Sequence, residues 1–192
     1  VLQFGFHSAA LQGLVVSSPS LGAFLGSVFI FRLSDWLGRR AELRIGAVLY
    51  MVGASLEVLS GAAILPDWLF VGLLLIGRTV YGFGIAFAMH GGPTYISEMA
   101  PSEMRGLLVS LKEAAIVAGI LTGYVLGNAF SKTTGGWVYA YGCSLLMSST
   151  MLVLSLFTIP RSCRWLVLSG LDDEALESMR FVYTEERALE EF

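Results

Sequence analysis

The sequence predicts an all-α integral membrane protein with five transmembrane helices. Of its 192 residues, 55% are hydrophobic and only 14% are charged, whereas a soluble globular chain has about 25% charged residues. The mean hydropathy is +0.72. Five apolar stretches each supply the ~20 residues that a helix needs to cross a bilayer. The chain therefore carries too little polar surface for a soluble fold.

The boundaries of the five helices follow from the polar and glycine-rich connections between them. We expect membrane helices at residues 9–33, 43–64, 68–99, 107–130 and 137–159. Residues 1–8 are expected to form an extracytoplasmic loop, and SDWLGRRAELR at 34–44 a polar turn. The third helix would be ~48 Å long and should project past the membrane. Since the first residue is Val1, we interpret the chain as a piece of a longer one.

The basic residues predict which connections face the cytoplasm. They flank the first and third connections and follow the last helix: Arg32, Arg39, Arg40, Arg44, Arg105, Lys112, Arg161 and Arg164. Because Lys and Arg mark cytoplasmic loops, these three regions are predicted on the cytoplasmic side. Lys132 in the fourth connection is the exception.

Residues 160–192 are expected to form a cytoplasmic linker and an amphipathic helix. Asp172 is placed to cap that helix, with more acids in its first turn. An apolar stripe of Leu176, Met179 and the Phe181–Val182 pair favours docking on the cytoplasmic face over a merely solvated charged helix.

Three ionisable residues lie inside the expected helices, namely Glu57, Arg78 and Glu113. A charged side chain at mid-membrane costs roughly 2.5–3.5 kcal/mol and persists by facing a cavity or a partner. Arg78 and Glu113 are therefore candidate functional residues. Glu57 lies near the outer end of its helix, and reaching the interface is the simpler interpretation of that residue.

Two further polar residues have a structural and a functional interpretation. Lys112 adjoins Glu113, but neighbours on a helix point ~100° apart, so we expect no pair and a Lys112 that reaches the surface. His90 could take part in proton coupling, although a single histidine in a glycine-rich stretch is more often a packing residue. No Ser/His/Asp set, metal-ligand cluster or phosphate loop indicates an enzyme or a cofactor.

Four separated segments resemble signatures of the sugar porter family of the major facilitator superfamily. DWLGRR at 35–40 resembles D-R-x-G-R-R, and GRTVYGFG at 77–84 contains R-x-x-x-G-x-G. PTYISEMAPSEMRG at 93–106 matches P-x-Y-x-[SA]-E-x-A-P-x-x-x-R-G, and PRSCRWL at 160–166 resembles P-E-S-P-R-[WY]-L. AMHGGP at 88–93 and SLKE at 110–113 are most similar to the xylose–proton symporter-like branch.

The chain departs from the family pattern at several positions. Arg161 and Cys163 stand where the last motif has Glu and Pro, and Trp36 replaces a basic residue of the first. Val138 replaces the arginine of G-W-R, and Glu113 stands where many members have a sugar-binding Gln. The resemblance therefore implies a thinner cytoplasmic salt-bridge network.

The resemblance implies helices two to six of twelve, within the N-terminal six-helix half of a major facilitator fold. It implies a hexose or pentose transporter that works by alternating access with proton symport; the alternatives are a facilitative uniporter and a non-transporting sugar sensor. The implied partners are a sugar, protons, the lipid bilayer, and the first helix and C-terminal half of the same transporter, with no cofactor, metal or nucleic acid. The sequence does not choose between plasma, vacuolar and plastid membranes, and we expect no transport by this piece alone.

The resemblance also implies roles for individual residues. Glu113 would bind the sugar. Arg78 would take part in proton coupling beside an aspartate of the first helix. The residues that would close the cytoplasmic gate are Asp35, Gly38, Arg39, Arg40, Glu98, Arg105 and Arg164.

Overall fold

The computed structural model describes residues 9–61 and 66–183, and these are helical without any strand. Five of the helices are long and apolar enough to cross a membrane. They are α1 (Ala9–Leu37), α2 (Arg39–Ser60), α3 (Asp67–Met99), α4 (Ser102–Phe130) and α5 (Gly136–Phe157). Two short helices follow, α6 (Cys163–Leu168) and α7 (Asp172–Arg180). The predicted all-α chain with five membrane helices is confirmed, while the loop expected at 1–8 lies outside the described residues.

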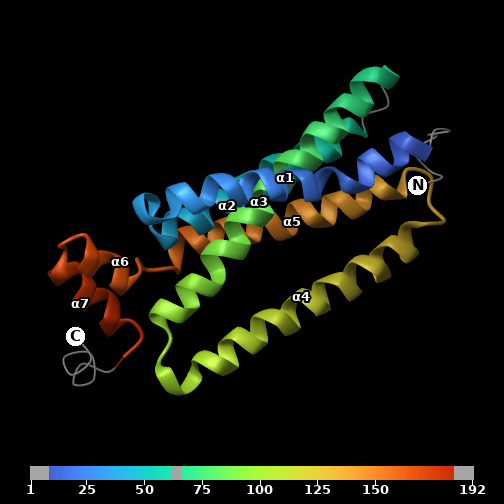
Figure 1. The fold of residues 1–192 in the computed structure, drawn as a ribbon. Coiled ribbons are helices and arrows are strands. Elements are labelled where there is room, and N and C mark those ends of the chain that lie inside the picture. Colours follow the sequence, from blue (N-terminus) through green and yellow to red (C-terminus); the bar gives the residue numbers. More distant parts are fainter. Residues whose placement is uncertain (1–8, 62–65, 184–192) are drawn as a thin grey trace.

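The helices form a closely packed group and one outlying member. α3 packs against α1 and α2, and α2 also packs against α5. α4 stands apart from α1 and α2 and connects to the group at its two ends (Figure 1). None of the α4 residues is buried. α6 and α7 lie together beyond one end of the group (Figure 1), which we call the α6–α7 end.

Glycines allow α3 to approach its two neighbours closely. A Cβ atom at Gly26 of α1 would lie 2.8 Å from the Cβ of Ala86, and one at Gly53 of α2 would lie 2.6 Å from the backbone nitrogen of Tyr81. Both distances are shorter than real Cβ contacts. Small residues are the usual means by which membrane helices pack backbone to backbone, so these two seams hold α1, α2 and α3 as one unit.

The polar turn expected at 34–44 is almost entirely helical. α1 continues to Leu37 and α2 begins at Arg39, so only Gly38 interrupts them. Its φ of 75° and ψ of 153° fall in a region that is essentially restricted to glycine. The prediction was wrong because polar residues indicate where a helix leaves the membrane, and they do not by themselves end it.

Two details of the tail prediction are also wrong. Leu171 occupies the N-cap position of α7, and Asp172 is already helical. The side chains that α7 buries are Ala175, Ser178 and Met179. Phe181 is 69% exposed, because the helix ends at Arg180 and its periodicity does not extend to the expected stripe.

Candidate functional site

Arg39, the first residue of α2, joins three segments at the α6–α7 end. Its Nε donates a hydrogen bond to Oε1 of Glu98 at 3.1 Å, and its Nη1 lies 3.3 Å from Oε1 of Glu42. The other carboxylate oxygen of Glu98 accepts a 2.5 Å hydrogen bond from the hydroxyl of Ser162, just before α6. The Glu98 and Glu42 side chains are 7% and 0% exposed. Buried charges persist when they are paired and hydrogen-bonded, so this cluster ties α2, α3 and α6 together.

Glu42 is the member of this cluster that the sequence analysis does not identify. Its Oε2 lies 2.9 Å from Nδ1 of His90, whose ring packs edge-on against Phe31. The histidine is thus both packed and hydrogen-bonded. The three-residue spacing between Arg39 and Glu42 could have predicted that these two residues pair, since residues three apart share one face of a helix.

Other residues that were predicted to close the gate have weaker contacts. Oδ1 of Asp35 lies 3.8 Å from Nη2 of Arg39, and the Asp35 side chain is 97% exposed. Arg164 and Asp35 line the same hollow of about 470 Å³, which also reaches Glu98. Arg105 is exposed and donates a long 3.4 Å hydrogen bond to the carbonyl of Ala100. Among the described residues, the structure therefore groups Asp35, Arg39, Glu98 and Arg164 and leaves Arg105 at the edge.

Trp165 of α6 anchors the break between α1 and α2. Its Nε1 donates a 3.0 Å hydrogen bond to the carbonyl of Asp35. Its ring covers Gly38 so closely that a Cβ there would lie 2.9 Å from a ring carbon. Ser162 caps α6 by accepting a hydrogen bond from the Trp165 backbone at 3.3 Å. α6 was not predicted from the sequence, although a serine before a short apolar run is a common helix start.

Two more contacts join the end of α3 to the segment that leads into α6. The hydroxyl of Tyr95 donates to the carbonyl of Pro160 at 3.3 Å. The Cys163 thiol lies 3.4 Å from the carbonyl of Glu98, and burial raises the pKa of this thiol. The two motif segments 93–106 and 160–166 are thus direct neighbours in space.

Arg78 forms a second candidate site inside the helix group. It donates a hydrogen bond to the hydroxyl of Tyr141 on α5. Glu57 of α2 is 3% exposed and interacts electrostatically with Arg78. Nε of Arg78 is buried and has no hydrogen-bond partner among the described residues. Glu57 therefore does not reach the interface, because its position on α2 faces the neighbouring helices.

Glu113 lies on the exposed α4, with 64% of its side chain accessible. Its Oε1 is 2.5 Å from Nζ of Lys112. The expectation that these two residues do not pair is wrong, since both side chains are long enough to bend across the ~100° between them.

In the part of the chain that the structure describes, no cluster of three or more His, Cys, Asp or Glu is suited to a metal ion.

Comparison with known proteins decides the family. A family model described as sugar (and other) transporter matches residues 5–192. The chain belongs to this sugar transporter family. The resemblance that the motifs indicated is thereby confirmed, as is a multi-pass integral membrane protein. The relatives of this sugar transporter chain are transporters and not enzymes.

Individual relatives of the sugar transporter chain are described as sugar–proton symporters or as similar to them. It is 46% identical over 168 residues to D-xylose-proton symporter-like 3, chloroplastic, of Arabidopsis thaliana, which covers 88% of this chain and 28% of the relative. It is 35% identical over 185 residues to the arabinose-proton symporter of Escherichia coli, covering 96% of this chain and 37% of that one.

Solved structures of the xylose transporter XylE share the fold. One, the proton:xylose symporter bound to 6-bromo-6-deoxy-D-glucose, superposes with a TM-score of 0.86 at 27% identity, covering 98% of this chain and 44% of that chain. A partially occluded inward-open form from E. coli gives a TM-score of 0.84, covering 94% and 46%. The sugar transporter chain thus spans less than half of the proteins that it matches.

Proposed function

We propose that the chain supplies helices two to six of a monosaccharide–proton symporter that works by alternating access. The observation that carries the proposal is its 46% identity to a xylose-proton symporter-like protein, across segments that include both candidate sites. In such transporters, two halves rock about a central substrate site and expose it to each side in turn.

The cluster around Arg39 and Glu98 suits a gate on the cytoplasmic side. Its bonds connect the start of α2, the end of α3 and the segment before α6. A charge-assisted network with fixed geometry can hold one state closed and must break when the halves move. We assign this role to Asp35, Gly38, Arg39, Arg40, Glu98, Arg105 and Arg164, with Glu42 as an addition.

Arg78 suits proton coupling. It is half-buried near the buried carboxylate of Glu57, and its Nε is buried without a hydrogen-bond partner among the described residues. A carboxylate on the first helix, as the family resemblance implies, would complete this site. Protonating that carboxylate would release Arg78 and shift the balance between the two states.

Glu113 suits sugar binding. It stands on a face of α4 that no described residue covers, so the rest of the transporter can close over it with a substrate between. A carboxylate accepts two hydroxyl hydrogen bonds at once, and charge-assisted bonds are stronger than neutral ones.

The chloroplastic relative makes the plastid envelope the first membrane in which to look for this protein.

The proposal is tested with the full-length protein in proteoliposomes. We expect uptake of radiolabelled xylose or glucose that accelerates with an inward proton gradient and slows with an uncoupler. An uptake rate that the uncoupler does not change would indicate facilitated diffusion and not symport. Specific sugar binding without any uptake would point instead to a sensor.

A further inference from the structure

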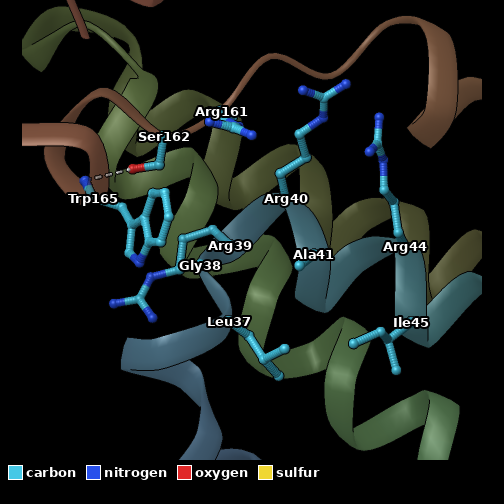
Figure 2. Close-up of a pocket in the computed structure, with 10 residues that line it drawn as sticks. All are labelled: Leu37, Gly38, Arg39, Arg40, Ala41, Arg44, Ile45, Arg161, Ser162 and Trp165. Atoms are coloured by element: carbon cyan, nitrogen blue, oxygen red, sulfur yellow. Dashed lines mark hydrogen bonds between the residues drawn. The ribbon is translucent and has the colours of Figure 1, made fainter. Parts of the chain in front are cut away.

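We propose that a phosphate group binds between the start of α2 and the segment that leads into α6. A pocket of about 290 Å³ lies there, and its walls carry four arginines, one backbone glycine, Ser162 and Trp165 (Figure 2). The guanidinium groups of Arg40, Arg44 and Arg161 lie on one side of the Trp165 ring, and that of Arg39 lies on the other (Figure 2). Arg39 is already paired with Glu98 and Glu42, so the three other arginines define the site.

Arg40 is the centre of this arrangement. Its Nε is buried and has no hydrogen-bond partner among the described residues. No carboxylate among those residues forms an ion pair with it, in contrast to its neighbour Arg39. Arg44 and Arg161 both repel it electrostatically. A buried donor without an acceptor costs free energy. An anion in the pocket would accept a hydrogen bond from Nε of Arg40 and would offset the repulsion among the three arginines.

The other two arginines keep donors available. Arg44 donates from Nε to the carbonyl of Ser155 at 3.2 Å and from Nη2 to that of Leu156 at 3.0 Å, so it is held in place without losing its charge. Arg161 pairs with Glu174 of α7 at 2.8 Å, but both side chains are about half exposed. An exposed pair of this kind is weak. Glu174 therefore competes with an anion and does not exclude one.

The sequence explains why this chain has such a pocket. Arg161 stands where the family motif has Glu, so a carboxylate beside Arg40 is replaced by a third cation. Planar guanidinium groups match the oxygens of phosphate and can bind two of them at once. A phosphate group carries the charge and the acceptors that the pocket lacks. The inference is independent of which sugar the protein transports.

Two sources could supply the phosphate, a soluble ion and a lipid headgroup. For the first, full-length protein in detergent is titrated with inorganic phosphate at constant ionic strength, and its thermal stability is measured. For the second, the protein is placed in nanodiscs of phosphatidylcholine alone or with added phosphatidic acid, and co-purifying lipid is measured by native mass spectrometry. We expect protection or retention in at least one arm.

Three variants and one control make the test specific. Arg161→Glu restores the family's carboxylate and should weaken phosphate binding by about tenfold or more, as should Arg40→Gln. Glu174→Gln removes the competitor and should strengthen it. Arg32→Gln changes the charge by the same amount as Arg40→Gln, but at an exposed position outside the pocket, and should leave phosphate binding unchanged.

The responses in the two arms show whether the site binds phosphate and which source supplies the phosphate. Protection by inorganic phosphate assigns the site to a soluble ion, and enrichment of phosphatidic acid alone assigns it to a headgroup. No response in either arm overturns the proposal. Equal responses in the parent protein, Arg161→Glu and Arg40→Gln also overturn it, because they would reflect a general effect of anions.

Discussion

Nε of Arg39 lies 3.1 Å from Oε1 of Glu98, which joins the first residue of α2 to the last turn of α3 across 59 positions of sequence. The same carboxylate accepts a hydrogen bond from Ser162, so this side chain also ties the helix group to the segment before α6. Hydrogen bonds to charged groups contribute ~1.5–3 kcal/mol each. Glu98 is therefore the residue on which the connection between α2, α3 and the segment before α6 most depends.

Replacing Glu98 with Gln should loosen the segment that leads into α6. Cys163 reports this, because its thiol rests on the carbonyl of Glu98. Burial raises the pKa of the Cys163 thiol, which leaves less reactive thiolate at any given pH. In Glu98→Gln the pKa should fall back toward its ordinary value, because the thiol becomes less buried and because the Glu98 charge, which also raises this pKa, is removed. Maleimide should then label Cys163 about tenfold faster at neutral pH.

Labelling is measured on the Cys163 peptide of the full-length protein by mass spectrometry. Asp35→Asn is the matched control, since that carboxylate is 97% exposed and 3.8 Å from Arg39. Equal acceleration in both variants would contradict a specific role for Glu98.

Replacing Gly38 with Ala should destabilise the connection between α1 and α2. The backbone region of Gly38 costs other residues ~1–3 kcal/mol, and the new methyl would also meet the Trp165 ring at 2.9 Å. Gly135→Ala provides the comparison, with φ of 71° but nothing within 4 Å of its Cβ. Thermal unfolding of the full-length protein should show a larger loss for Gly38→Ala. Equal losses would mean that the contact with Trp165 contributes nothing.

Replacing Tyr141 with Phe should disturb Arg78. The phenol hydroxyl is the hydrogen-bond partner that the described residues offer to this guanidinium. Its loss leaves a buried donor unsatisfied, which costs ~1–3 kcal/mol. We expect lower thermal stability and, if the proposed function holds, slower proton-driven uptake. Tyr139→Phe, on the same helix but 57% exposed, should change neither quantity. Normal uptake by Tyr141→Phe would show that Arg78 does not need this contact.

Replacing Glu113 with Ala should weaken sugar binding, if the proposed function holds. Losing charge-assisted hydrogen bonds should raise the half-saturation concentration for uptake by about tenfold or more. Lys112→Ala removes the same ion pair but keeps the carboxylate, so it should leave that concentration nearly unchanged. Similar increases in both variants would indicate that the ion pair, and not a bond to sugar, is responsible.

The membrane helices and the family were predictable from the sequence because both depend on local patterns. A stretch of ~20 apolar residues suits a bilayer whatever surrounds it. The motifs at 35–40, 93–106 and 160–166 identify the family without any knowledge of contacts. The position of Gly38 was visible in the same way, although its role as the sole interruption between α1 and α2 was not.

The pairing of side chains was decided by the tertiary structure. Nothing in the local sequence singled out Glu42, and its side chain is fully buried between Arg39 and His90. Glu57 was predicted to reach the interface, and it faces Arg78 inside the group. Whether a charge is buried depends on which helix lies opposite. That relation involves residues far apart in sequence, so local pattern does not contain it.

By itself, the sequence determined an all-α membrane chain, its family and the segments that carry the motifs, since hydropathy and motif spacing are properties of the linear chain. Only the tertiary structure decided that Glu98 serves both Arg39 and Ser162, that α6 covers Gly38, and that Arg40, Arg44 and Arg161 share one pocket. The physical reason is that electrostatic and packing energies depend on distances in space, which are settled when the helices pack.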